Sequence, residues 1–215
     1  LAMKVVTLVG GVGGAKLAYG LSRIVPPEDL TIIVNTADDF WHYGLRICPD
    51  LDTITYTLSG LVDPVNGWGL AEDTTQMLEA LRRYGEDAWF RLGDRDLATH
   101  LIRSERLRNG ERLTSVTAYL TGKLGILPAI LPMTDEPVAT KVMTLEHGEL
   151  DFQTYFVRHR WQPVVTALRL DGLEQASLTS ECRRALEQAD ISLIGPSNPW
   201  LSIDPILALP GVRTL

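Results

Sequence analysis

The stretch KVVTLVGGVGGAK, residues Lys4–Lys16, decides the fold. Its first part, Lys4–Val9, is short, rich in β-branched residues and without polar alternation, which is typical of a buried parallel strand. The glycine-rich turn Gly10–Lys16 follows, and apolar residues then recur at the spacing of one helix face. A second apolar run, Leu30–Val34, completes a β-loop-α-β unit. Such a unit predicts a parallel sheet, because its right-handed crossover needs a helix that covers the sheet.

The glycine-rich turn is a candidate phosphate site. At the start of a helix, unpaired amides and the helix dipole point toward an anion, and glycine lets the backbone approach a diphosphate. The candidate residues are Gly11, Gly13, Gly14 and Lys16. The turn matches neither standard nucleotide motif, because Lys16 stands where a dinucleotide fingerprint has its third glycine and no G-K-[ST] sequence ends the turn. The alternative is a tight turn that binds nothing.

A second candidate site is the acidic stretch NTADDFWHYGLRICPDLDT, residues 35–53, which begins with Asn35. It places Asp38, Asp39, Asp50 and Asp52 beyond the end of the Leu30–Val34 strand, where open α/β sheets bind their ligands. Mg2+ prefers oxygen ligands and usually takes one or two carboxylates together with substrate phosphates. The alternative is that these aspartates only cap helices and turns.

Two further polar clusters are candidate ligand contacts. Asp94 is expected to cap a helix on which Asp96 shares a face with Thr99 or His100, although a lone helical histidine is more often structural than catalytic. The loop PSNP follows a predicted strand at 190–195 and therefore lies at the carboxyl edge of the sheet. Its candidate nucleotide or phosphate contacts are Ser197 and Asn198.

The remaining pattern predicts the rest of an α/β fold. Helices are expected at 52–60, 71–84, 114–124 and 179–189, and a last short strand at 206–209. Strands at 138–145, 150–157 and 164–170 predict an antiparallel block, with 146–149 as a hairpin turn. We therefore expect a Rossmann-like parallel sheet with helices on both faces and an antiparallel strand extension. The chain, 1–215, is expected to be a single domain with 134–170 as its mainly β part.

The composition excludes several classes of protein. A net charge of −7 argues against nucleic-acid binding, which needs a basic face. Cys48 and Cys182 lack CxxC spacing, which disfavours a disulfide scaffold or a zinc site and fits a reducing cytosol. The longest apolar run, Leu124–Met133, contains two prolines and is too short to cross a bilayer. No signal peptide precedes the first strand, so we expect a cytoplasmic protein with no membrane partner.

The chain resembles the 2-phospho-L-lactate transferase family in stretches spread along nearly its whole length. These are LVGGVGGAK (8–16), NTADDFWHYGLRICPDLDT (35–53), GWGLAEDT (67–74), WFRLGDRDLATH (89–100), TDEPVATKV (134–142), FQTYFVRHR (152–160) and GPSNPWLSIDPILALPG (195–211). Related nucleotide-sugar-binding regulators share the glycine loop and ADD, but carry a GDIRN-type segment where this chain has CPDLDT. The family continues past ILALPG into another glycine- and lysine-bearing loop, which this chain is expected to lack.

The resemblance implies a reaction. A 2-phospholactate or enolpyruvyl phosphate unit would pass from a guanosine diphospho donor (LPPG or EPPG) to the ribityl hydroxyl of the deazaflavin FO. GMP would leave, Mg2+ would be required, and the product would be F420-0 or its dehydro form. A homodimer is also implied. The alternatives are a nucleotide-sugar-binding regulator without transferase activity and, less favoured because the glycine fingerprint is wrong, a nicotinamide oxidoreductase.

The resemblance also assigns roles. Gly11, Gly13 and Gly14, with Lys16 and Asn35 beside them, would hold the donor diphosphate. Asp50 and Asp52 would bind the metal, and Asp38 or Asp39 would orient the acceptor hydroxyl or hold metal-bound water. Ser197 and Asn198 would contact the nucleotide, whereas Asp94, Asp96, Thr99 and His100 would line the acceptor side. The aromatic residues nearest these stretches, as candidate walls for the deazaflavin, are Trp41, Tyr43 and Trp68.

Overall fold

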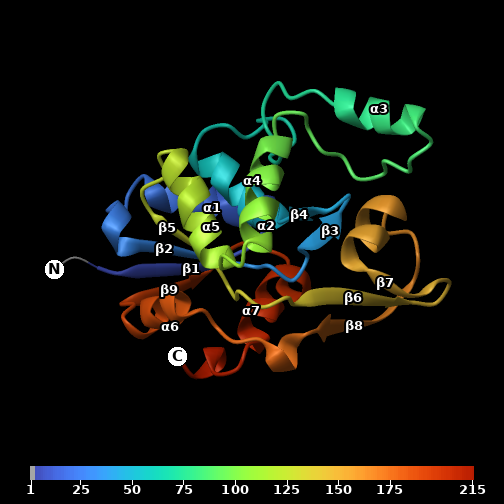
Figure 1. Ribbon diagram of the computed structural model, residues 1–215. Helices are drawn as coiled ribbons and strands as arrows, with labels where there is room; N and C mark the ends of the chain where they lie inside the picture. Colours follow the sequence, from blue (N-terminus) through green and yellow to red (C-terminus); the bar gives the residue numbers. More distant parts are fainter. Residues whose placement is uncertain (1–2) are drawn as a thin grey trace.

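A parallel four-stranded sheet forms the centre of the molecule in the computed structural model, which describes residues 3–215 (Figure 1). Its strand order is β5 (Ala129–Pro132), β2 (Leu30–Val34), β1 (Val5–Val9) and β9 (Ile191–Ile194). The predicted β-loop-α-β unit supplies the two central strands, which pair in parallel along their whole length. The expected α/β fold is confirmed.

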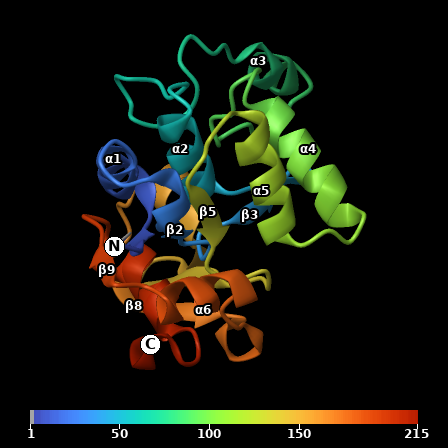
Figure 2. The same ribbon diagram turned by 90° about the vertical axis from the view of Figure 1, so that its left-hand side faces the viewer.

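Helices cover both faces of this sheet (Figures 1 and 2). On one face lie α1 (Gly11–Ser22), α2 (Pro49–Leu58) and α5 (Leu113–Lys123), whereas α6 (Ser180–Glu187) and α7 (Asp204–Ala208) lie on the other. Neighbouring residues of each central strand therefore point into different apolar clusters, which explains why the strands are apolar without alternation.

The remaining helical segments lie around this core. They are α3 (Gln76–Arg83), α4 (Leu97–Arg108), and the short helical turns Pro27–Asp29, Thr154–Arg158, Leu173–Gln175, Pro199–Ile203 and Val212–Thr214. Among residues 3–215, no helix has the length and apolar character needed to cross a membrane.

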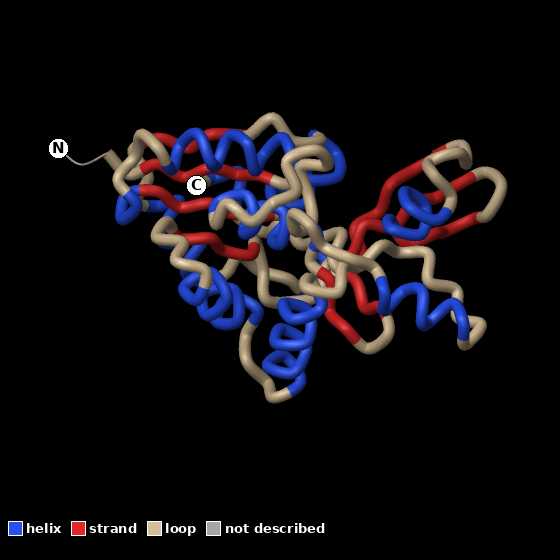
Figure 3. The backbone as a smooth tube through the Cα atoms, turned by 90° about the horizontal axis from the view of Figure 1, so that it is seen from above, coloured by secondary structure: helices blue, strands red, loops and turns tan. Residues whose placement is uncertain are grey.

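The predicted antiparallel extension is present as a second sheet, with β6 (Ala139–Thr144) between β7 (Gly148–Asp151) and β8 (Val165–Asp171). It projects to one side of the parallel sheet when seen from above (Figure 3). The strand expected at 150–157 was wrong beyond its start, because the chain turns into a short helical segment there. Phe152 stacks on Phe156 with ring centroids 5.4 Å apart, a contact that the four-residue spacing of a helix permits.

The acidic stretch contains a hairpin that is absent from the predicted elements. β3 (Phe40–His42) pairs antiparallel with β4 (Leu45–Ile47). The two residues between them, Tyr43 and Gly44, have φ values of 49° and 73°. Positive φ at both central residues is the signature of the tightest hairpin turn, which matches the twist of the flanking strands.

Other boundaries also differ from the expectations. α2 begins at Pro49 rather than at residue 52, and α3 begins at Gln76 rather than at 71. The strand expected at 206–209 was wrong, because this segment belongs to α7 and its end. Pro205 occupies the first turn of that helix, a position that suits its fixed φ and its missing N–H.

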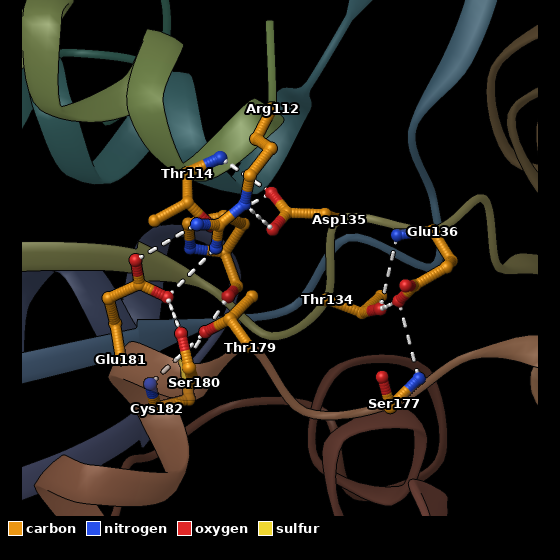
Figure 4. Close-up of polar contacts among 11 residues, drawn as sticks. Arg112, Thr114, Thr134, Asp135, Glu136, Ser177, Thr179, Ser180, Glu181 and Cys182 are labelled. Atoms are coloured by element: carbon orange, nitrogen blue, oxygen red, sulfur yellow. Dashed lines mark hydrogen bonds and ion pairs between the residues drawn. The ribbon is translucent and has the colours of Figure 1, made fainter.

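A polar clamp joins the two faces of the sheet at the carboxyl end of β5 (Figure 4). Arg112, just before α5, donates to Asp135 at 2.8 Å and to Glu181 of α6 at 2.9 Å. The same Asp135 accepts hydrogen bonds from the backbone and hydroxyl of Thr114, at 2.7 and 2.8 Å, and so caps α5. The bond from Arg112 lowers the pKa of Glu181 to about 2. The clamp fixes the turn that leaves the sheet for the antiparallel extension.

Candidate functional site

The glycine-rich turn binds one of the protein's own carboxylates. Helix α1 begins at Gly11 itself, so the glycines form its first turn instead of a loop before it. The N–H of Gly11 donates to Asp50 Oδ1 at 2.7 Å. The carboxylate of Asp50 therefore lies at this helix N-terminus, where the sequence predicted an anion.

Glycine is required here for close approach within the protein. A Cβ at Gly10 would collide with the Asp50 carboxylate, and a Cβ at Gly13 would collide with the carbonyl oxygen of Pro196. Among residues 3–215, the N–H groups of Val12 and Gly13 have no hydrogen-bond partner. They are the donors that this helix start leaves for a ligand. The predicted Lys16 is exposed, on the side of α1 that faces solvent.

The loop after β9 lies at the carboxyl edge of the sheet, as predicted, and it also contacts the glycine turn, where its polar groups bond within the protein. The hydroxyl of Ser197 accepts from the Gly10 N–H at 2.9 Å and donates to the Gly10 carbonyl at 2.8 Å. Asn198 Oδ1 accepts from the N–H groups of Trp200 and Leu201, each at 3.1 Å, and caps the helical turn that follows. These two residues close the loop on the glycine turn.

Two carboxylates share one amide beside the glycine turn. Asn35 Nδ2 donates to Asp38 Oδ1 at 2.8 Å and to Asp50 Oδ2 at 3.0 Å. Burial raises the pKa of Asp38, and the negative charge of Asp50 raises it further. Burial also raises the pKa of Asp50, to about 6, although hydrogen bonds from Asn35 and Gly11 oppose the shift. The positive charge of Arg46 opposes the raised pKa of Asp38.

Asp52 does not join this pair. It follows Asp50 by two positions in the first turn of α2, and residues two apart on a helix project toward opposite sides. Its carboxylate instead receives both terminal NH groups of Arg103 from α4. The structure therefore differs from the expected metal pair of Asp50 and Asp52, because α2 turns these two side chains to opposite sides. Asp50 instead shares the amide of Asn35 with Asp38.

Asp39 lies on the other side of the acidic stretch. It is buried, and its Oδ2 is 3.5 Å from an NH group of Arg46. Burial raises its pKa to about 7, although the positive charge of Arg46 opposes the shift. Its Oδ1 has no hydrogen-bond partner among the described residues. A carboxylate that titrates near neutral pH is suited to accept a proton.

The predicted acceptor cluster is divided: His100 is buried, whereas Asp94, Asp96 and Thr99 are half-buried. Asp94 caps α3 instead of α4, since it accepts from the N–H groups of Gln76 and Met77, each at 2.9 Å. His100 is 1% exposed, and its Nε2 is 3.0 Å from Asp96 Oδ2.

The hydroxyl of Tyr56 on α2 donates to Asp96. Thr99 is half-buried on the same helix as His100. Asp96 and His100 therefore join α4 to α2, and the acceptor role expected for them stays a prediction.

An aromatic cluster was missed. Phe40 and His42, on one side of the β3–β4 hairpin, pack against Trp89 and Phe90, with centroid distances of 4.8 Å (Phe40–Phe90) and 5.4 Å (His42–Trp89). The intervening Trp41 is 52% exposed and points away, as strand alternation requires. The signal that could have found this cluster is the two-residue period of FWH, which had to be combined with the turn at Tyr43.

Comparisons with known proteins agree on one family. A family model described as 2-phospho-L-lactate transferase CofD matches residues 5–215. The 2-phospho-L-lactate transferase of Methanosarcina mazei is 44% identical over 206 residues, which cover 96% of this chain and 68% of that protein. The phosphoenolpyruvate transferase of Mycobacterium ulcerans is 42% identical over 228 residues, covering 98% of this chain and 69% of that protein.

A crystal structure of a upf0052 family member from Bacillus halodurans has the same fold. It superposes with a TM-score of 0.68 at 17% identity and covers 100% of this chain and 65% of that chain. The chain thus spans 65% to 69% of the length of the proteins that it matches here.

Proposed function

The chain belongs to the 2-phospho-L-lactate transferase CofD family, an enzyme family of F420 biosynthesis, and we propose that the chain catalyses the following reaction. It transfers a 2-phospholactate or enolpyruvyl phosphate unit from LPPG or EPPG to FO and releases GMP. The observation that carries this proposal, besides the family match, is the Asp38–Asn35–Asp50 cluster at the start of α1.

The cluster fits a magnesium ion. Asp38 and Asp50 offer carboxylate oxygens that are held close together by hydrogen bonds to the same amide of Asn35, and burial raises the pKa of both. Mg2+ typically combines such a carboxylate pair with substrate phosphates. When bound, it supplies charge neutralisation for the donor diphosphate. Asp38 and Asp50 would hold it, while Asn35, which donates to both carboxylates, would keep them oriented.

The glycine turn provides the other half of the donor site. The N–H groups of Val12 and Gly13 and the positive end of the α1 dipole lie at the helix start where Gly11 donates to Asp50. They bind phosphate oxygens of the donor, and the exposed Lys16 adds positive charge nearby. Phosphoryl-type transfer needs mainly such positioning and charge compensation.

Asp39 accepts the proton of the acceptor. The ribityl oxygen of FO attacks the phosphorus that carries the three-carbon acid, the bond from that phosphorus to the GMP oxygen breaks, and the proton moves to the carboxylate of Asp39. A pKa of about 7 leaves much of this group ionised at neutral pH and basic enough to take a proton. The flat rings of FO lie against the cluster of Phe40, His42, Trp89 and Phe90.

A turnover assay tests the proposal. Purified protein is mixed with FO, LPPG or EPPG, and Mg2+, and formation of F420-0 and GMP is followed by chromatography. Asp50→Asn should abolish product formation, whereas Asp29→Asn, at the opposite end of the sheet, should leave it unchanged. Saturable FO and GDP binding without GMP release from either donor would replace the transferase by a nucleotide-sugar-binding regulator.

We propose further that the chain folds as a single domain, with 134–170 as its β extension, and forms a cytoplasmic homodimer. Apolar side chains on the open edge of the second sheet support the dimer, since Val165 is 41% exposed and Leu168 is 42% exposed. The acidic net charge supports a protein without a nucleic-acid partner. Light scattering after gel filtration measures the mass, and a monomer would refute the dimer.

A further inference from the structure

A buried arginine lies behind the candidate metal pair. Arg103 of α4 is 3% exposed. Its two terminal NH groups donate to the two carboxylate oxygens of Asp52, at 3.1 Å for the Oδ2 contact. The NH1 group also donates to the carbonyl oxygen of Arg46 at 3.3 Å. One side chain of α4 thus holds both α2 and the β3–β4 hairpin.

Both contacts lie on segments that carry the acidic site. Asp52 shares the first turn of α2 with Asp50, on the opposite side of the helix. Arg46 belongs to β4, and its side chain is 3.5 Å from Asp39. Arg103 touches neither Asp50 nor Asp39, so any effect on them must act through the backbone of these segments.

Arginine is the residue that such a position requires. Its planar group donates two parallel hydrogen bonds and fixes the orientation of a carboxylate, which lysine cannot do. Stability alone does not account for the pair, since buried ion pairs can often be replaced by apolar residues without loss. A role in orienting the first turn of α2 accounts for the Arg103–Asp52 pair better than stability does.

We propose that Arg103 is a positioning residue for the metal pair: by binding Asp52 it sets the rotation of α2 that places Asp50 between Gly11 and Asp38. The inference rests on the proposed function for its metal, but the hydrogen bond from Gly11 to Asp50 exists without one. Groups bonded directly to a metal ligand typically contribute about 10- to 100-fold in metal affinity, and Arg103, which acts through α2, is expected at the lower end of that range.

The experiment uses Arg103→Met and two readouts. Mn2+, which electron paramagnetic resonance detects, reports the affinity of the site in the presence of GDP. The amide NMR signal of Gly11 in 15N-glycine-labelled protein reports the bond to Asp50 without any metal. We expect a Kd for Mn2+ raised by about tenfold or more, together with a shifted Gly11 signal. Arg103→Lys, which keeps the charge but not the paired hydrogen bonds, should resemble Arg103→Met.

Arg106→Met is the matched control. Arg106 is on the same helix but donates to Glu111 at 2.8 Å on the outside and stacks on Tyr119. Both readouts should stay at the wild-type values in this variant. If Arg103→Met does not fold, the double variant Arg103→Met with Asp52→Leu, which leaves no unpaired charge, is judged by the same two readouts.

Two results separate the possible failures. A folded Arg103 variant with wild-type Mn2+ affinity and an unmoved Gly11 signal overturns the positioning role. Wild-type protein that binds no Mn2+ overturns the proposed metal site, while the Gly11 signal of the variants still decides whether Arg103 positions Asp50.

Discussion

The substitution Gly10→Ala should displace the carboxylate of Asp50 without changing its chemical identity. Gly10 has φ −157° and ψ 157°, an extended conformation that alanine adopts without strain. The added methyl group would collide with the Asp50 carboxylate and would lie 2.6 Å from Ser202 Cβ. Ordinary contacts need about 3.5 Å, so Asp50 and Ser202 must each move by about 1 Å.

The expected loss follows from that displacement. Misplacing a reacting group by about 1 Å costs on the order of 100-fold in rate, and overpacking a buried site costs about 1–3 kcal/mol of unfolding free energy. We therefore expect kcat/KM for transfer to FO to fall about 100-fold at saturating Mg2+, while the protein stays folded. Steady-state kinetics with FO as the varied substrate and urea denaturation measure the two effects.

Gly20→Ala is the control on the same helix. No atom lies within 4 Å of a Cβ at Gly20, which lies within α1. Alanine there should raise the unfolding free energy by about 0.5–1 kcal/mol and leave kcat/KM unchanged. The reasoning is refuted if Gly10→Ala retains wild-type kcat/KM, or if Gly20→Ala loses as much activity as Gly10→Ala.

Three further outcomes are expected. The raised pKa of Asp50, about 6 against 3.8, stabilises the fold below pH 4 and loses that contribution as pH rises through 6, about 3 kcal/mol in all; Mg2+ should therefore raise the thermal midpoint more at pH 8 than at pH 5, and equal shifts would contradict the metal pair. Arg112→Met should cost less than about 1 kcal/mol because its ion pairs are half-exposed, whereas Asp135→Ala, which uncaps α5, should cost about 1–2 kcal/mol in urea denaturation; the reverse order would show that the clamp and not the cap stabilises this end of the sheet. Asp94→Ala should cost about 1 kcal/mol through the lost cap of α3 and leave the KM for FO unchanged, and a raised KM in a folded variant would restore its predicted acceptor role.

Local sequence patterns predicted the strands that are buried on both faces of the sheet. The strands β1 and β2 are buried on both faces, so a short run of apolar and β-branched residues without polar alternation identifies them. The glycine turn follows directly from the strand that precedes it. The same reasoning failed at 150–157 and 206–209, because short apolar runs do not distinguish a strand from a helical turn.

The sequence predicted which segment carries the site, but not which of its carboxylates lie together. Residues 35–53 were identified as the acidic site, but whether Asp50 meets Asp38 or Asp52 depends on where α2 begins. In a loop, Asp50 and Asp52 could point to the same side, but in the first turn of α2 they point to opposite sides. His100 was a candidate ligand because its partner Asp96 is visible in the sequence, whereas its burial against α2 is a tertiary contact that no local pattern contains.

The departure of the glycine turn from the nucleotide motifs has a physical reason. A dinucleotide fingerprint uses its third glycine for close packing of helix on strand, but here the close contacts occur at Gly10, Gly13 and Gly14 and the residue at 16 is exposed. The first amide of α1 already holds a carboxylate. Donor phosphates placed beside that carboxylate would be repelled unless a cation lies between them, so the contact that makes this turn unusual also supports the metal ion that we propose for the site.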